Sequence, residues 1–353
     1  MTTHALPAAV EADALTMALR TAEVLSEGRV VAVRAVHSFP TVLSQLHRLV
    51  LDYEGASDAA PRHLYLKTDL PGRPAAEMDS GRREVAFYTT VAPATPLGLL
   101  PRCFDAQVAD SGAWHVLLED LTDSHTIASQ WPMPPTVTQT EAIVRCRARF
   151  QAAWWDHPRL GADVGAWTSR AEHDRWLADL AKEYEAFADA LGDRLPAARR
   201  AVYERLFAQA PRLMERGESR RHMTIAQGDG HVWNCFLPRA ETAETPRLFD
   251  WDGWHLGIGA EDLAYMIAMH WFPEMRRRAE GPLLDAFHDE LLAQGVAHYD
   301  RRALQDDYRL TVLWLTLRPI WMRALRIPTN LWWHHLERIH LAVDDLDCRA
   351  LLG

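Results

Sequence analysis

Residues 227–234 spell Gln-Gly-Asp-Gly-His-Val-Trp-Asn, and a second informative segment, Leu-Phe-Asp-Trp-Asp, occupies residues 248–252. Asp229 precedes Asn234 by five positions, and Asp250 follows Asn234 by sixteen. A phosphoryl-transfer site needs a carboxylate that takes the proton of an attacking hydroxyl, followed by amide and carboxylate oxygens that hold a metal ion. The order of these residues predicts such a site.

The first segment has the features of a catalytic loop. In the kinase pattern H-R-D-x-x-x-x-N, the aspartate orients the nucleophile and the asparagine binds Mg²⁺, and Asp229 and Asn234 have the same separation. Gly228 and Gly230 flank the aspartate, and glycine allows a tight loop that a bulky phosphate can approach. Taken alone, the segment could equally be a polar hairpin, because Asp-Gly is a common turn pair.

The second segment predicts a short buried strand, Arg247 to Phe249, that delivers Asp250 at its end. Mg²⁺ binds hard oxygen ligands, usually one or two carboxylates together with water and phosphate. We therefore expect Asn234 and Asp250 to be the metal ligands that the protein supplies. Asp252 is either a further ligand or a solvated, capping acid.

Together these residues resemble the aminoglycoside phosphotransferase and choline kinase family, whose signature is H-G-D-x-H-x-x-N followed by a strand ending in I-D-W-[ED]. Gly228, Asp229, His231 and Asn234 match the first motif, and residues 250–252 match the second. The leading histidine is replaced by Gln227, which puts the geometry of the loop in question. The resemblance implies a bilobal, protein-kinase-like α+β fold, with a sheet-containing nucleotide lobe at residues 1–118 and a larger helical lobe at 119–353. It also implies ATP, or another nucleoside triphosphate, and Mg²⁺.

By the same resemblance, an upstream lobe binds the nucleotide. Lys67, in a predicted strand, would grip the phosphates, and Glu84, in a predicted helix, would hold the lysine. The backbone around Glu119 and Leu121 would bond the adenine edge. Ser38, in a predicted turn at residues 37–41, would cover the phosphates together with Thr41 or Ser44. Ordinary surface charges and a plain core strand are the alternatives for these positions.

The remainder of the chain is predicted to be mainly helical, with Pro196 and Pro211 at breaks or first turns of helices. Asp262 resembles the family acid that fixes the backbone of the catalytic loop. Tryptophans in the last hundred residues are expected mostly in the core, and the family builds its acceptor pocket from these helices. Five acids could line that pocket or lie on a solvated face: Asp306, Asp307, Glu337, Asp344 and Asp345.

Composition limits the function. The net charge of −10 argues against a nucleic-acid partner, which needs basic patches, and it is compatible with a cationic substrate. We expect no secretion signal and no membrane partner, because no segment has the required apolar length. Four scattered cysteines, without metal-binding spacing, indicate reduced thiols and a cytoplasmic protein.

We therefore predict a kinase that phosphorylates a hydroxyl group of a small molecule, such as an aminoglycoside or nucleoside antibiotic, a sugar or an amino alcohol. One alternative is a metal-dependent hydrolase whose ligands would come from His222, Asp229, His231, Asp250 and His255. Another is a nucleotide-binding regulator without activity, a pseudokinase. A protein kinase is disfavoured, since D-F-G, A-P-E and a glycine-rich loop are missing from the sequence.

Overall fold

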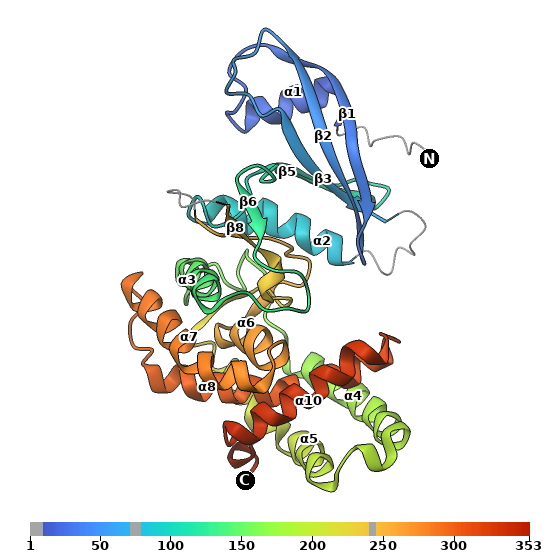
Figure 1. Cartoon of the computed structure of the whole chain (residues 1–353), viewed down its shortest axis with the longest axis vertical. Coiled ribbons are helices and arrows are strands. Elements are labelled where there is room, and N and C mark those ends of the chain that lie inside the picture. Colours follow the sequence, from blue (N-terminus) through green and yellow to red (C-terminus); the bar gives the residue numbers. More distant parts are fainter. Residues whose placement is uncertain (1–9, 71–78, 240–244) are drawn as a thin grey trace. The chain divides into compact units, whose positions relative to one another are not determined.

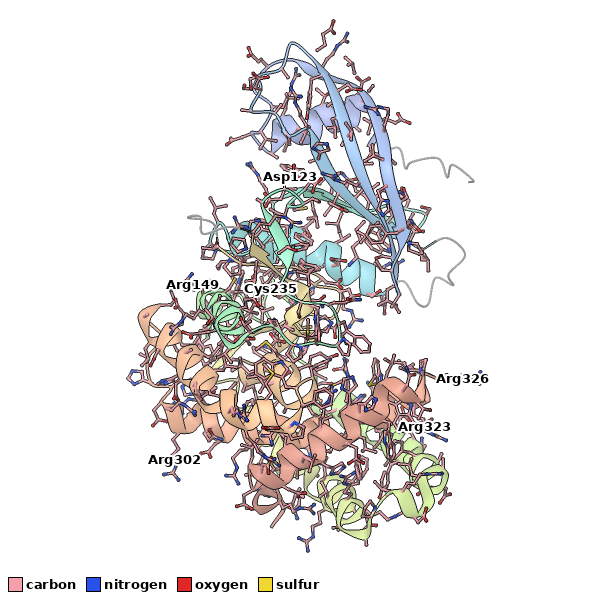
Figure 2. All side chains as sticks on the ribbon, in the orientation of Figure 1. Asp123, Arg149, Cys235, Arg302, Arg323 and Arg326 are labelled. Carbon is pink, nitrogen blue, oxygen red and sulfur yellow. The ribbon has the colours of Figure 1, made fainter. Side chains whose placement is uncertain are left out.

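A computed structural model describes residues 10–70, 79–239 and 245–353 (Figure 1). The chain forms two compact units. Unit 1 comprises Met1–Thr126 and Phe236–Trp254, and unit 2 comprises Ile127–Cys235 and His255–Gly353. Cys235, labelled in Figure 2, is the last residue of unit 2 before the chain returns to unit 1. The predicted α+β class is confirmed, whereas the lobe boundary after residue 118 stays a prediction.

Unit 1 contains a five-stranded antiparallel sheet in the order β1-β2-β3-β5-β4. Alternate residues of β2 and β3, among them Leu49, Leu64 and Leu66, are fully buried, and helix α1 packs against β1 on the same core. The apolar alternation of these segments therefore fixes which face of the sheet is covered. The elements are α1 (Ala12–Thr21), β1 (Arg29–Pro40), β2 (Ser44–Glu54), β3 (His63–Asp69), β4 (Cys103–Val108) and β5 (Trp114–Glu119).

Helix α2 (Asp79–Ala86) continues into a π-helical turn at Phe87–Val91. A Cβ atom on Gly81 would lie 2.0 Å from the ring of Trp114 on β5, so only glycine allows this close approach of helix and strand. Phe87 stacks on Trp251 with ring centroids 4.1 Å apart, and the indole of Trp254 donates to the carbonyl of Arg83 at 2.7 Å. These contacts tie the helix that carries Glu84 to the segment that carries Asp250.

A three-stranded sheet in the order β6-β8-β9 is formed by β6 (His125–Ile127), β8 (Cys235–Pro238) and β9 (Arg247–Leu248). The strand predicted to run to Phe249 thus ends one residue earlier. Asp250 has a φ of 67°, a left-handed conformation that aspartate tolerates better than most residues and that no strand contains.

Unit 2 is mainly helical, with one two-stranded sheet that pairs β7 (Met223–Ala226) with β10 (His255–Ile258). All four residues of β7 are buried, and α3 packs against both β7 and α7. The helices are α3 (Val137–Ala153), α4 (Arg170–Leu191), α5 (Ala197–Glu218), α6 (Ala260–Ala264), α7 (Pro273–Ala293), α8 (Arg301–Leu315), α9 (Arg318–Ala324) and α10 (Thr329–Asp345).

The two prolines expected at breaks or first turns of helices, Pro196 and Pro211, differ in their positions relative to α5. Pro196 directly precedes α5, as predicted, but Pro211 lies inside α5, which continues to Glu218. A buried face on both sides of Pro211, with Leu206, Ala210 and Leu213, outweighs the loss of one backbone hydrogen bond. Within the described residues, no helix combines the length and the apolar character that crossing a membrane requires.

Candidate active site

The loop between β7 and a short 3₁₀ turn at Val232–Asn234 carries Asp229. Gly228 adopts a φ of 81°, which L-residues with a side chain rarely accept. A Cβ on Gly230 would lie 2.6 Å from the Oδ1 atom of Asp262. Both glycines are therefore needed, the first for its backbone conformation and the second for the close approach of an acid.

Asp262 holds the backbone of this loop. Its carboxylate accepts hydrogen bonds from the backbone N–H of Gln227, at 3.0 and 3.1 Å, and from that of Gly228, at 3.2 Å. This contact is the one predicted for the acid. It fixes the loop at the two residues directly before Asp229.

Arg147 on α3 completes a buried network that the sequence did not reveal. Its Nη1 donates to Asp262 at 2.7 Å, and its Nη2 donates to the side-chain oxygen of Gln227 at 2.9 Å and to the carbonyl of Gly230 at 3.1 Å. The side chain is fully buried. One signal was available: Arg147 lies on the apolar face of its helix, where an arginine needs a partner. Gln227, at the position of the family histidine, serves as an acceptor for this arginine.

Asp229 lies among three polar side chains. The Oη of Tyr265 donates to Oδ1 at 2.6 Å, Nδ2 of Asn234 donates to Oδ2 at 3.2 Å, and Nε2 of His231 lies 3.4 Å from Oδ2. The same Asn234 amide donates to the backbone carbonyl of Asp229 at 2.9 Å. Asp229 and Asn234, predicted to act together, are thus in direct contact.

Tyr265 was not identified from the sequence. It begins a π-helical turn, Tyr265–Met269, that follows α6, and such turns often occur at functional sites. Burial, followed by the charge of Asp229, raises the pKa of the Tyr265 phenol, so the hydroxyl remains a hydrogen-bond donor to the carboxylate at neutral pH.

Unit 1 holds a second cluster of predicted site residues. The ammonium of Lys67 lies 2.7 Å from Glu84 and 2.6 Å from Oδ1 of Asp250, and Glu84 is buried. Burial alone would lower the pKa of Lys67, but the negative charges of Glu84, Asp250 and Asp252 raise it above its ordinary value. The lysine therefore stays cationic. The predicted pairing of Lys67 with Glu84 is present in the structure, and Asp250 joins it.

The residues predicted to contact the nucleotide base and phosphates lie in unit 1 as well. Glu119 ends β5, and the carbonyl of Leu121 accepts from the backbone N–H of His125 at 2.8 Å. Ser38 lies within β1, and its hydroxyl bonds Nδ1 of His47 on the paired strand at 2.8 Å. The turn predicted at residues 37–41 is wrong in register, because β1 pairs with β2 as far as Pro40. The chain turns after Thr41, whose hydroxyl bonds that of Ser44 at 2.8 Å.

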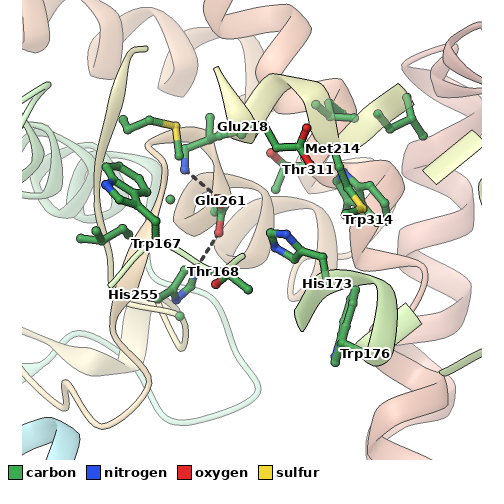
Figure 3. Close-up of a pocket in the computed structure, with 18 of the residues that line it drawn as sticks. Trp167, Thr168, His173, Trp176, Met214, Glu218, His255, Glu261, Thr311 and Trp314 are labelled. Atoms are coloured by element: carbon green, nitrogen blue, oxygen red, sulfur yellow. Dashed lines mark hydrogen bonds and ion pairs between the residues drawn. The ribbon is translucent and has the colours of Figure 1, made fainter. Parts of the chain in front are cut away.

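A cavity of about 870 Å³ opens in unit 2 beside the loop that carries Asp229. Gly228, Asp262 and Tyr265 line one part of it, and Trp167 and Trp314 lie on opposite sides (Figure 3). This volume is in the range of ligand pockets. The tryptophans of the last hundred residues were expected mostly in the core, and Trp271 and Trp332 are core residues, whereas Trp314 and Trp321 line this cavity.

The five C-terminal acids proposed for the pocket are not among its lining residues. Each lies near an arginine elsewhere in unit 2, as Asp307 with Arg216 and Glu337 with Arg199, both at 2.7 Å. Arginine partners therefore account for these acids: Asp306, Asp307, Glu337, Asp344 and Asp345.

The ligand set of the hydrolase alternative does not assemble. In the part of the chain that the structure describes, no group of three or more His, Cys, Asp or Glu side chains is placed to hold a metal ion. His255 instead bonds Glu261 at 2.7 Å, and His222 packs against Tyr299. Mg²⁺ in a phosphotransferase requires fewer protein ligands, and the oxygens of Asn234 and Asp250 are of the type it prefers.

The chain has relatives in sequence and in structure. Residues 41–296 match the model of the ecdysteroid kinase-like family. No curated protein sequence matches the chain significantly. Among solved structures, it is similar to a candidate aminoglycoside phosphotransferase from Ralstonia eutropha JMP134, with a TM-score of 0.60 and 13% identity over 96% of this chain and 99% of the other.

Two further structures share the fold. The GDP complex of wild-type aminoglycoside 2'-phosphotransferase-IIIa has a TM-score of 0.53 and 10% identity, covering 92% of this chain and 97% of the other. A microcompartment-associated aminopropanol kinase has a TM-score of 0.51 and 15% identity, covering 94% and 96%. The predicted relation to the aminoglycoside phosphotransferase and choline kinase group and the protein-kinase-like fold are confirmed.

Proposed function

We propose that this chain, which belongs to the ecdysteroid kinase-like family, transfers a phosphoryl group from a nucleoside triphosphate to a hydroxyl group of a small molecule. One observation carries the proposal. Tyr265 lines the cavity of unit 2 and also donates a 2.6 Å hydrogen bond to Asp229. A carboxylate able to accept a proton thus lies one hydrogen bond away from a residue that lines a space of the size of a small-molecule acceptor.

In the proposed reaction, Asp229 orients the acceptor hydroxyl and takes its proton as the oxygen attacks the γ-phosphorus in line. The bond between the γ-phosphorus and the bridging oxygen breaks, and the nucleoside diphosphate leaves. The hydrogen bonds from Tyr265 and Asn234 hold the carboxylate in one orientation. Mg²⁺, when bound, neutralises charge on the β- and γ-phosphates. Because the transition state is loose and no covalent intermediate is needed, positioning of the hydroxyl and electrostatic stabilisation supply most of the rate.

We assign nucleotide binding to the residues of unit 1 that the sequence indicated. Lys67, held by Glu84, would bind the phosphates, and the backbone around Glu119 and Leu121 would bind the base. Ser38 would cover the phosphates, which requires its hydroxyl to exchange the hydrogen bond that it now shares with His47. Asn234 and Asp250 are the proposed Mg²⁺ ligands. The donor is ATP or GTP; the related 2'-phosphotransferase was solved with GDP.

The test is a transfer assay with Asp229→Asn. Wild-type protein is supplied with MgATP or MgGTP and a panel of hydroxylated acceptors. The variant should lose about a hundredfold to ten-thousandfold in kcat, the usual contribution of a general base, while its nucleotide affinity stays unchanged. Asp179→Asn, at an exposed position paired with Lys182, is the matched control and should leave kcat unchanged. An Asp229→Asn variant with more than about a tenth of wild-type kcat contradicts the role of the base.

A further inference from the structure

The walls of the unit 2 cavity are largely aromatic. Four tryptophans line it, from the segment before α4, from α4, from α8 and from α9: Trp167, Trp176, Trp314 and Trp321. Met214, labelled in Figure 3, and Leu310 add apolar surface that is not aromatic. Flat indole surfaces recognise ring systems by stacking, with a gain beyond the apolar area buried. The cavity therefore favours an acceptor with an aromatic body.

The acids of the cavity already have partners within the protein. Glu218 pairs with Arg170 at 3.0 Å, and Asp262 pairs with Arg147. Glu261 bonds His255 and the backbone N–H of Ile258, both at 2.7 Å. Glu172 completes the capping box of α4 with Ser169. A cationic acceptor would have to compete with these bonds, so the negative net charge of the chain does not by itself predict a cationic ligand.

Arg318 differs from these groups. It lines the cavity, and within the described residues no carboxylate lies within ion-pairing distance of its guanidinium. Its Cζ atom lies 4.5 Å from the ring centre of Trp321 and 5.2 Å from that of Tyr265. The guanidinium is thus held by two aromatic rings while its hydrogen-bond donors are not matched by an acid. Such a stacked arginine is suited to bidentate recognition of a carboxylate.

Arg318 and the catalytic carboxylate share one neighbour. Tyr265 presents its ring to Arg318, its phenol also interacts with this guanidinium, and its hydroxyl donates to Asp229. A ligand bonded to Arg318 through an anionic group would therefore extend along Tyr265 toward the position where a hydroxyl reacts. At physiological ionic strength, charges farther away than about 8 Å are largely screened, so this local cation outweighs distant surface acids.

We propose that the acceptor is a hydroxylated aromatic carboxylate, whose ring system stacks between the tryptophans and whose carboxylate pairs with Arg318. This proposal rests on the proposed function, since it assigns the acceptor of that same site. In this proposal, Arg318 is the residue that makes the site prefer an anionic acceptor over a neutral or cationic one. Arg220, exposed and stacked on Trp167 at 5.4 Å, adds positive charge at the rim of the cavity.

The experiment uses three matched probes that share a hydroxymethylnaphthalene ring: the carboxylate, its primary amide and the corresponding aminomethyl compound. Binding is measured without nucleotide by quenching of tryptophan fluorescence and by calorimetry, and phosphoryl transfer is measured separately. The variants are Arg318→Gln and Arg318→Lys. Arg323→Gln is the control, because Arg323, labelled in Figure 2, belongs to α9 as Arg318 does and does not line the cavity.

Wild-type protein should bind the carboxylate at least tenfold more tightly than the amide, with the amine weakest. Arg318→Gln should abolish this preference and leave the affinity for the amide within about threefold of wild type, which shows that the cavity is intact. Arg318→Lys should retain part of the preference, because lysine keeps the positive charge but lacks the planar pair of donors. Arg323→Gln should behave as wild type.

Three outcomes would overturn the proposal: equal binding of carboxylate and amide by wild-type protein, preference for the amine, or loss of kcat by the same factor for all three probes in Arg318→Gln with binding unchanged. The last would place the guanidinium on the transferred phosphoryl group. Charge-dependent binding without any transfer would instead overturn the proposed function and leave the ligand class supported.

Discussion

Replacing Asp262 by alanine should destabilise the protein strongly, because this one carboxylate accepts four hydrogen bonds. Two come from the backbone of Gln227 and Gly228, one from Arg147 at 2.7 Å and one from Gln151 at 3.2 Å. Without the carboxylate, the fully buried guanidinium of Arg147 loses its counter-charge. Breaking a buried ion pair by removing one partner costs about 3–5 kcal/mol. For a folding unit of roughly 150–250 residues, each kcal/mol lowers Tm by about 2–4 °C, so Asp262→Ala should lower Tm by about 6–20 °C.

The measurement is thermal unfolding followed by circular dichroism, with urea titration for the free energy of unfolding. Asp179→Ala is the matched control, since Asp179 pairs with Lys182 at 3.0 Å on the surface, with both side chains more than 75% exposed. Its free energy of unfolding should change by no more than about 0.5 kcal/mol. The double variant Arg147→Met, Asp262→Leu should be less destabilised than the sum of the single variants. A free energy of unfolding for Asp262→Ala within about 1 kcal/mol of wild type would refute the view that the buried pair holds the loop.

Three further predictions concern the metal ligand, the altered motif residue and pH. Asp250→Asn should weaken binding of the Mg²⁺–nucleotide complex in calorimetry, because it removes an anionic ligand, and unchanged binding would exclude Asp250 from the metal site. Gln227→His should keep kcat within about tenfold of wild type, roughly 1.4 kcal/mol of activation free energy, since an imidazole nitrogen can also accept a hydrogen bond from Arg147. Gln227→Leu should lower kcat further, because it leaves that donor unpaired. A large gain of kcat in Gln227→His would mean that the natural loop is impaired. Burial lowers the pKa of His335 to about 4 and that of His340 to about 3, so the unfolded chain binds more protons below pH 6.5 and stability is lost as pH falls. Between pH 7 and pH 5, each histidine should lower the free energy of unfolding by about 2 kcal/mol. Urea titrations that show the same free energy of unfolding at both pH values would contradict this prediction.

Candidate residues of the site could be named from the sequence where they lie close together along the chain. The spacing of Asp229 and Asn234 fixes them on one short loop, and the flanking glycines signal its tight geometry. Asp250 could be identified for the same reason, since it directly follows a short apolar strand. The position of Ser38 was misjudged because strand length depends on pairing with β2, which no local pattern of β1 encodes.

Contacts between side chains far apart in the sequence could not be predicted from the sequence alone. Arg147 meets Gln227 from 80 positions away, and nothing in either segment names the other. Tyr265, the first residue of the π-helical turn after α6, meets Asp229 from 36 positions away along the chain. The charge preference proposed for the cavity depends on which acids already pair with arginines, as Glu218 does with Arg170. Within the described residues, no acid pairs with Arg318. Local sequence determines which groups are present and their backbone conformation, whereas burial and pairing, which set charge and orientation, arise only when distant segments pack together.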